Sequence, residues 1–470
     1  MTFLTRAIPA RRLMAGAALL TSWLLPAATA ATASRLNLVL ILADDLGQRD
    51  VGYEGHPLHE TPHIDRLAAS GMRFSDAYSA CAVCSPTRAA IMTGKYPGRL
   101  RLTTHIRPDN GPHPRGKLKT PDSKLWLEAE EVTIAEALRE AGYTCASIGK
   151  WHLGEQNGAQ YRPQNQGFSR VVLSQQHGFF EYFYPFVDPK KWPYAGPLPG
   201  KKGDYLPDRL TDEALVFIEE NRNRPFFLYL SHWSPHNPLE AKPDKIARYD
   251  RKLQAAPGSG NATYAAMVES LDESVGRVLA KLDALGLGEN TLVVFTSDNG
   301  AVTGNGRQSS VGPYRESKSH YYEGGIRVPL AVRWPGVTAP GSLCRTPVIS
   351  TDFFPTMLEA AGIPLRPQDH RDGVSLVPLL RGGAGLPRDS LFWHFPHYHL
   401  GGGQPCGAVR TGRWKLLEFF ERDAVELYDL QADPGERQNL ASAQPERAAT
   451  LRQTLVDWRA STRAAMPVRP

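Results

Sequence analysis

Residues 36–45 read LNLVLILADD, and this stretch decides how the rest of the chain is interpreted. The eight residues before the two aspartates form an almost uninterrupted apolar run, which is typical of a strand buried on both faces. Such strands occur in parallel sheets that are covered by helices. The stretch therefore predicts an α/β fold in which acidic side chains stand directly at the end of a buried strand.

Further buried strands alternate with helices along most of the chain. The helix that the sequence predicts from Thr133 has a capping box, because Glu136 stands three residues later. This order predicts a large, doubly wound, mostly parallel sheet flanked by helices. The predicted strands are residues 143–148, 225–231, 291–297 and 328–334, and the clearest long helix is 263–285.

The pattern changes near residue 386, where short strands with turn residues between them replace the alternation. They are followed by a helix at 445–460. We therefore expect a catalytic α/β domain at 35–385 and a smaller C-terminal α+β subdomain with an antiparallel sheet at 386–470. Its predicted strands are 391–395, 407–410, 414–420 and 425–430.

Residues 1–30 have the features of a signal peptide. Arg6, Arg11 and Arg12 precede an apolar run at 13–25, and Ala28-Thr29-Ala30 fits a cleavage site for small residues. The run is shorter than the ~20 residues that a membrane-spanning helix needs. The sequence predicts export to the periplasm or the exterior, with no membrane span. The Arg11-Arg12 pair leaves the Sec and twin-arginine routes both open.

Charge and cysteine content exclude other classes. The chain has 54 Lys and Arg against 48 Asp and Glu, so without the three arginines of the predicted signal peptide the net charge is 54 − 3 − 48 = +3. That excess is too small for a nucleic-acid-binding surface. The odd number of cysteines leaves at least one unpaired and does not indicate a disulfide framework; they stand at 81, 84, 145, 344 and 406.

Polar side chains follow several predicted strands, at the point where each strand ends. Open α/β sheets bind ligands beyond the carboxyl ends of their strands, so these side chains should share one rim. Three aspartates and an asparagine offer hard oxygen ligands, which suit Ca²⁺ or Mg²⁺. Each acidic pair alone is equally typical of a turn or a helix cap. The residues concerned are Asp44, Asp45, Lys150, His152, His236, Asp298 and Asn299.

Cys84 is the candidate for the reactive residue. Pro86 can start a helix, which places residue 84 at a helix N-terminus, where an anion is favoured, and Arg88 follows one turn later. The alternative is that Cys81 and Cys84 form a redox pair or half of a zinc site. No second pair at zinc spacing exists in the sequence.

Residues 84–95, CSPTRAAIMTGK, resemble the signature of the type I sulfatases, a Cys-x-Pro-x-Arg motif with a downstream Thr-Gly. The resemblance is to the formylglycine-dependent sulfatases of the alkaline phosphatase-like superfamily, and it covers nearly all of the mature chain. The other matching motifs are ADDLG at 43–47, GKWHLG at 149–154, SPH at 234–236, SDNG at 297–300, Lys318 ahead of YEGG at 322–325, ELYDL at 426–430 and DPGE at 433–436.

This resemblance implies a cofactor set. Cys84 would be oxidised to Cα-formylglycine by a formylglycine-generating maturation enzyme. The modified residue would share a calcium ion, with Mg²⁺ as the alternative, with four other residues: Asp44, Asp45, Asp298 and Asn299.

The resemblance also implies the catalytic roles. Arg88 would hold the aldehyde hydrate and His152 would hydrogen-bond it. Lys150 and Lys318 would bind the sulfate oxygens, and His236 would face the oxygen of the leaving group.

The implied activity is a sulfuric ester hydrolase that releases sulfate from a sulfated carbohydrate or an aryl sulfate. One alternative is a phosphonate monoester or phosphodiester hydrolase of the same superfamily. Another is a non-catalytic sulfoglycan-binding protein in which Cys84 is never oxidised. Nucleic acid is not an expected partner.

The expected substrate contacts lie in residues 393–403, WHFPHYHLGGG. This segment resembles one in bacterial sulfatases that act on galactose-type sugars, with O4 as the sulfated position. Aromatic faces and imidazole groups suit sugar rings and hydroxyls. We expect His397 to contact the substrate, together with Lys150, His236 and Lys318. The alternative is a strand end with solvated histidines.

Overall fold

The computed structural model describes residues 1–4, 7, 35–107, 114–174, 181–188, 190, 198–255, 260–304, 307–308 and 312–470. The chain divides into residues 1–34 and residues 35–470, and every element below belongs to the second unit. Most of the predicted signal peptide lies outside the described residues. In the described part, no helix has the length and apolar character needed to cross a bilayer.

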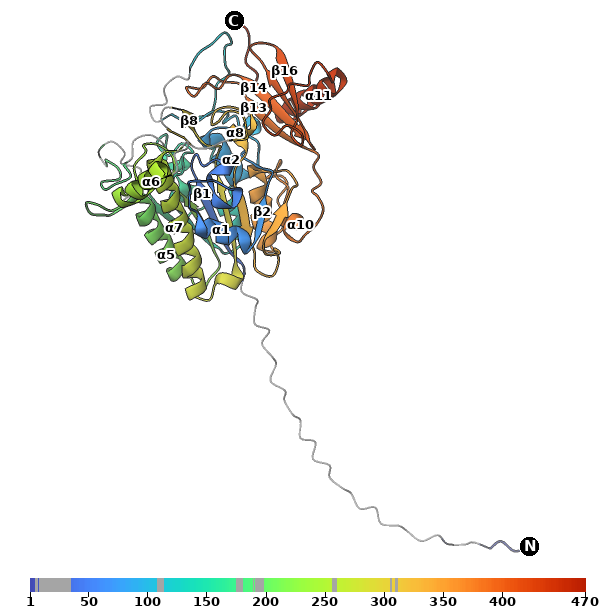
Figure 1. Cartoon of the computed structure of the whole chain (residues 1–470). Coiled ribbons are helices and arrows are strands. Elements are labelled where there is room, and N and C mark those ends of the chain that lie inside the picture. Colours follow the sequence, from blue (N-terminus) through green and yellow to red (C-terminus); the bar gives the residue numbers. More distant parts are fainter. Residues whose placement is uncertain are drawn as a thin grey trace. The chain divides into compact units, whose positions relative to one another are not determined.

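An eight-stranded sheet forms the centre of residues 35–470 (Figure 1). Strand β10 runs antiparallel to both of its neighbours, and all other neighbouring strands are parallel. The predicted mostly parallel sheet is therefore confirmed. In spatial order the strands are β11 (Ser342–Cys344), β2 (Met72–Phe74), β10 (Leu330–Arg333), β7 (Thr291–Ser297), β1 (Asn37–Ala43), β6 (Phe226–Ser231), β4 (Thr144–Gly149) and β5 (Arg170–Val172).

Strand β1 shows why its sequence is apolar throughout. Val39 and Ile41 pack into the core formed with α1, α5, α6 and α7, whereas Leu38 and Leu40 pack into the core formed with α2, α4, α9 and α10. Successive side chains of a strand point to opposite faces, so a strand between two helical layers needs apolar residues at every position. Helices cover both faces, as in a doubly wound sheet.

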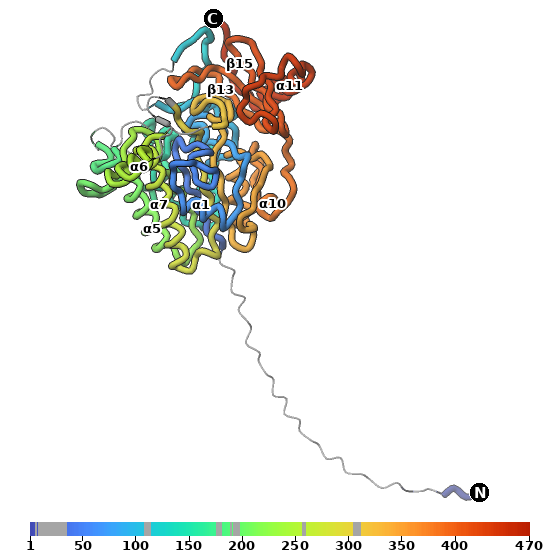
Figure 2. Tube along the Cα trace, viewed as in Figure 1, coloured from blue at the N-terminus to red at the C-terminus, as the bar shows by residue number. Residues whose placement is uncertain are grey.

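The helices of residues 35–470 vary in length from about one turn to about six turns. The predicted capping box of α4 is present, since Thr133 and Glu136 each accept a hydrogen bond from the backbone N–H of the other. Figure 2 shows α5, α6 and α7 gathered on one side and α10 on the other. The helices are α1 (Pro62–Ala69), α2 (Cys84–Thr93), α3 (Pro97–Leu100), α4 (Ile134–Glu140), α5 (Leu206–Glu220), α6 (Pro243–Ala255), α7 (Ala262–Ala284), α8 (Glu323–Ile326), α9 (Phe353–Ala360), α10 (Val377–Leu380) and α11 (Pro445–Thr462).

Two further pairs of short strands lie outside the two larger sheets. Two-residue strands pair as β3 (Ala77–Tyr78) with β12 (Val348–Ile349), and as β8 (Thr303–Gly304) with β9 (Arg307–Gln308).

A separate four-stranded antiparallel sheet lies in the C-terminal part, as predicted, and α11 packs on it. Its apolar core includes residues of the segment 78–83, which leads into α2. The indole Nε1 of Trp393 also donates a hydrogen bond to the carbonyl oxygen of Ser79 at 2.8 Å. The sheet thus braces the start of α2, whereas a domain boundary at 385/386 stays a prediction. The strands are β13 (Ser390–Phe395), β14 (Cys406–Thr411), β15 (Trp414–Phe419) and β16 (Ala424–Asp429).

Candidate active site

The site lies at the carboxyl ends of four neighbouring parallel strands, in the order β7, β1, β6 and β4. Parallel strands end at the same edge of a sheet, so residues far apart in sequence meet there. All of the predicted strand-end residues are buried at this edge: Asp298 and Asn299 after β7, Asp44 and Asp45 after β1, His236 beyond β6, and Lys150 and His152 after β4.

Groups that could hold a metal ion converge at this edge. Asp44, Asp45, Cys84 and His236 each offer a ligand atom, and these atoms lie within 4.8 Å of one another. The Asp45 carboxylate accepts a hydrogen bond from Asn299 Nδ2 at 2.7 Å. Buried Asn299 Oδ1, by contrast, has no hydrogen-bond partner among the described residues. A buried oxygen without a donor is unfavourable unless it binds a cation, so the donor set fits Ca²⁺ or Mg²⁺.

Cys84 is the first residue of α2, two residues earlier than the start expected from Pro86. Its side chain is 1% exposed, and Sγ lies 3.5 Å from Asp44 Oδ1 and 3.4 Å from Lys318 Nζ. Burial, together with the carboxylates of Asp298 and Asp44, raises the pKa of the Cys84 thiol well above its ordinary value. An unmodified thiol here stays protonated and is a poor nucleophile.

Three cations pair with the three aspartates. Lys150 Nζ lies 2.5 Å from Asp44 Oδ2, and Lys318 Nζ lies 2.6 Å from Asp45 Oδ1. Burial alone would lower the pKa of Lys318, but the carboxylates of Asp45, Asp44 and Asp298 act together with Cys84 to outweigh it, and the pKa is raised. Burial would raise the pKa of Asp44 and that of Asp45, but the nearby lysines together with His236 outweigh it, and both pKa values are lowered. Asp44, Asp45 and Lys318 are therefore ionised at neutral pH.

Arg88 reaches back from the second turn of α2 to the same carboxylates. Its Nε and Nη2 lie 2.9 and 2.8 Å from Asp298 Oδ2, and Nη2 lies 3.7 Å from Asp44 Oδ2. Its Nη1 donates to Ser231 Oγ at 2.6 Å and to the carbonyl oxygen of Lys150 at 3.0 Å. Arg88 thus ties the start of α2 to the ends of four strands, β7, β1, β6 and β4.

The two predicted histidines come from the loops after β6 and β4. His236 Nδ1 lies 2.8 Å from the carbonyl oxygen of Asn237, which only accepts, so Nδ1 carries a hydrogen and Nε2 is directed to Asp45 Oδ2 at 3.5 Å. Burial lowers the pKa of His236, and Asp45 opposes this shift. His152 Nε2 lies 2.8 Å from the carbonyl oxygen of Ile106, and its backbone has a φ of +62°.

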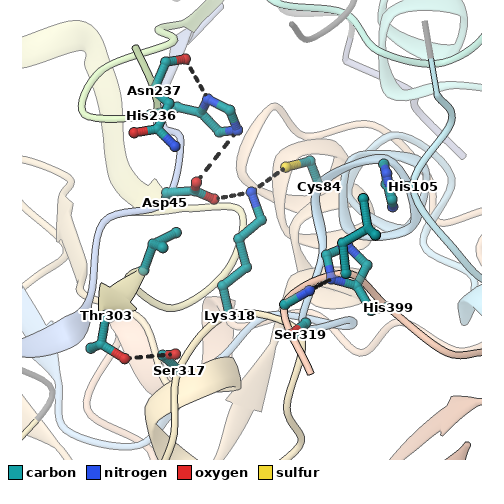
Figure 3. Close-up of a pocket in the computed structure, with 13 residues that line it drawn as sticks. Asp45, Cys84, His105, His236, Asn237, Thr303, Ser317, Lys318, Ser319 and His399 are labelled. Carbon is teal, nitrogen blue, oxygen red and sulfur yellow. Dashed lines mark hydrogen bonds and ion pairs between the residues drawn. The ribbon is translucent and has the colours of Figure 1, made fainter. Parts of the chain in front are cut away.

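A pocket of about 520 Å³ opens above these groups. Figure 3 shows His236, Asp45, Lys318 and Cys84 linked in a chain of contacts, with His105 and His399 on the far side of Cys84. The lining mixes polar and apolar surface, and His399, Leu400 and Gly401 come from the segment 393–403 in which substrate contacts were expected. The sequence did not point to the other groups, which are His105, Asn237, Val302, Thr303, Ser317 and Ser319.

Two family models match the chain. The model of the sulfatase family matches residues 36–363, which is more than half of the chain. The chain belongs to the sulfatase family. The model of the C-terminal region of N-sulphoglucosamine sulphohydrolase matches residues 316–461. The match to the sulfatase model covers the large sheet, and the second match covers the C-terminal antiparallel sheet of this sulfatase.

Individual relatives agree with this assignment. Human arylsulfatase A is 35% identical over 480 residues, covering 91% of this chain and 88% of the relative. Mouse N-acetylgalactosamine-6-sulfatase is 34% identical over 400 residues, covering 81% of this chain and 71% of the relative. The crystal structure of Ps i-CgsB in complex with k-i-k-neocarrahexaose has 30% sequence identity and a TM-score of 0.76. The match covers 90% of this chain and 93% of the chain in that structure. The protein is therefore an enzyme that hydrolyses sulfate esters.

In this sulfatase one predicted substrate contact, His397, lies outside the residues that line the pocket. His397 is only 2% exposed, its Nε2 lies 2.7 Å from Thr103 Oγ1, and it is not among the described residues that line the pocket. His399, two residues later, lines the pocket instead. The segment leaves β13 at Phe395 and turns, and the turn sends His397 inward against Thr103.

Proposed function

We propose that this sulfatase releases sulfate from sulfated carbohydrates by using Cys84 after its oxidation to Cα-formylglycine. The place of Cys84 is the observation that carries the proposal. It stands at the first residue of α2, lines the pocket, and lies between the carboxylate of Asp44 and the ammonium of Lys318. An aryl sulfate is the simpler substrate that the same groups would accept.

A divalent cation completes the proposed site. The residues that would hold it are Asp44, Asp45, Asp298, Asn299 and the modified residue 84, with Ca²⁺ as the ion and Mg²⁺ as the alternative. When bound, the ion would supply positive charge where negative charge develops on the sulfate oxygens. The unpartnered Oδ1 of Asn299 supports this assignment.

The modified residue 84 and the side chains around it would carry out the other steps of the hydrolysis. The formylglycine hydrate supplies two hydroxyls on one carbon, one to attack sulfur and one to expel the sulfate afterwards. Lys150 and Lys318, both charged beside the aspartates, would stabilise the sulfate oxygens in the transition state. His236, as an imidazolium protonated on both ring nitrogens, would donate the Nε2 proton to the alcohol oxygen as its bond to sulfur breaks, which leaves the neutral ring with its hydrogen on Nδ1. Arg88 and His152 would hold the hydrate in place.

Polar groups in the pocket lining support a sugar rather than a wholly apolar substrate. His105, His399, Asn237 and Ser317 offer donors and acceptors for hydroxyl groups. The names of two relatives, an N-acetylgalactosamine-6-sulfatase and a protein bound to a neocarrahexaose, point in the same direction. A galactose-type sugar sulfated at O4 is the substrate that we propose.

We also propose export of the enzyme to the periplasm or the exterior, on the strength of residues 1–30. Its partner in maturation would be a formylglycine-generating enzyme that acts on the motif beginning at Cys84.

Rates on a panel of substrates test the proposed function. The panel contains mono- and disaccharides that each bear one sulfate, an aryl sulfate, a phosphonate monoester and a phosphodiester. We expect sulfate release to be fastest from a galactose-type 4-O-sulfate. Faster turnover of the phosphonate or the diester would overturn the proposal in favour of the other hydrolase class, and binding without turnover would favour a sulfoglycan-binding protein.

Removal of the metal should abolish activity. Asp45→Ala and Asp298→Ala should each lose most of the bound ion, and because the ion is expected to supply several kcal/mol, activity should fall by more than about 100-fold. Ca²⁺ should restore a chelated enzyme better than Zn²⁺, since the ligands are hard oxygens. Elemental analysis measures the occupancy.

Asp250→Ala is the matched control, because Asp250 is exposed on α6. It should keep both metal and activity. Full metal occupancy in either Asp45→Ala or Asp298→Ala would show that the ion binds elsewhere.

A further inference from the structure

A second pocket, of about 550 Å³, lies at the far end of α2 from Cys84. Its lining comes from α3, from the end of α11, from residues that directly follow α2, α3 and α11, and from two loops. The residues are Lys95, Arg99, Arg101, Glu131, Arg371, Ser461, Thr462 and Arg463. Five of them are cations and one is a carboxylate, and we call this group the basic pocket.

Two of the five cations are neutralised locally. Lys95 forms an ion pair with Glu131, and Arg99 binds the Asp372 carboxylate through Nε and Nη2 at 2.9 and 2.7 Å. The other three cations are exposed and form no salt bridge within the described part of the chain: Arg101, Arg371 and Arg463. The basic pocket therefore carries about three uncompensated positive charges, and such clustered like charges favour the binding of an anion.

Helix ends account for only part of this arrangement. Arg101 and Arg463 follow the last residues of α3 and α11, where a cation is favoured by the helix dipole. Both have left-handed backbones, with φ of +56° and +54°, at positions where glycine is the usual residue. Arg371 ends no helix. The helix ends alone do not explain why three arginines surround one cavity.

We infer that the basic pocket binds the sulfate groups of a glycan chain at a point remote from the active site. The identity of the occupant rests on the proposed function. Guanidinium groups bind tetrahedral oxyanions through paired hydrogen bonds, and the volume fits a short saccharide segment.

The distance between the two sites explains why the basic pocket is not a part of the active site. Helix α2 has ten residues, and at 1.5 Å per residue its ends are about 15 Å apart. A single sulfated sugar at Cys84 would not reach the basic pocket, whereas another part of a polymer would. A chain that occupies both would gain affinity through effective concentration.

Binding of dextran sulfate to the full-length mature protein tests the inference. The test variant carries Arg101→Gly, Arg371→Gln and Arg463→Gly, and glycine suits the two left-handed positions. The control carries Arg139→Gln, Arg224→Gln and Arg251→Gln. It removes the same charge from exposed arginines that form no salt bridge with described residues.

The test variant should bind dextran sulfate about tenfold more weakly than the natural protein, because each surface arginine contributes modestly. The slope of log affinity against log salt should decrease by about 2, for three lost contacts. The control variant should change affinity much less. Both should hydrolyse 4-nitrophenyl sulfate at the natural rate, and Arg371→Gln alone should weaken binding about two- to threefold.

Equal weakening in the two triple variants would overturn the inference, since it would reflect net charge alone. Tighter binding of polyphosphate than of dextran sulfate would also overturn the assignment to a sulfated glycan. Failure of the proposed function is a separate result, because it would appear as no turnover of any sulfate ester, whatever the binding measurements give.

Discussion

Replacement of Cys84 by alanine should leave the protein folded but lower its activity by on the order of 10⁵-fold or more, because the nucleophile is lost. Alanine suits the first turn of α2 and removes only one sulfur from a buried position. The measurement is kcat/KM on an aryl sulfate, together with thermal unfolding to confirm the fold. Mass spectrometry of the natural protein should find an aldehyde at residue 84 and no alkylatable thiol.

Cys81→Ala is the matched control for this experiment. Cys81 is also buried, with Sγ 2.8 Å from the hydroxyl of Tyr321, and burial raises the pKa of its thiol to about 11. It lacks the spacing to Pro86 and Arg88 that the modification motif requires, so this variant should keep most of its rate. Equal losses in the two variants would revive the redox-pair interpretation, although all five cysteines are free thiols in the structure.

Replacement of His236 by alanine should lower kcat/KM by a larger factor as the leaving alcohol becomes more basic. A nitrophenolate leaves without help, whereas a sugar alkoxide needs a proton in the transition state. General acid catalysis is worth roughly 10²–10⁴-fold, so the sugar sulfate should slow by about that factor and nitrophenyl sulfate by much less. The hydrogen bond from His236 Nδ1 to Asn237 fixes the ring so that Nε2 is available for this transfer.

Lys318→Ala serves as the comparison, since Lys318 would contact the sulfate that both substrates share. It should slow both substrates by similar factors. The readout is kcat/KM for each variant on each substrate, expressed as a difference in activation free energy. If His236→Ala slows good and poor leaving groups equally, His236 binds sulfate or supports the fold, and the proton comes from another group.

The sequence was sufficient to predict the elements that position the site. Buried strands have a clear apolar signature, and polar residues that follow them must meet at one edge if the strands are parallel. This is why Asp45 and Asp298 could be placed together despite the 253 residues that separate them. The spatial order of the strands and the antiparallel direction of β10 were not predicted, because pairing depends on contacts distant in sequence.

The sugar-facing side of the site was predicted less well. Whether His397 or His399 faces the pocket depends on the path of residues 396–403, where the His399 N–H donates a hydrogen bond to the Gly403 carbonyl oxygen. Nothing in the local pattern fixes that path. The basic pocket was missed for a related reason, because its arginines are scattered from Arg99 to Arg463 and form no basic run in the sequence.

The burial of α2 also bears on when Cys84 could be modified relative to folding. All ten residues of the helix are buried, and the core of the C-terminal sheet includes residues of the segment that leads into it. A modifying enzyme of protein size would reach Cys84 only before this burial is complete. The oxidation that we propose would therefore come before folding ends. A chain that folded first would keep its thiol, so the ratio of active to inactive molecules would be set by the relative rates of folding and modification and would stay fixed afterwards.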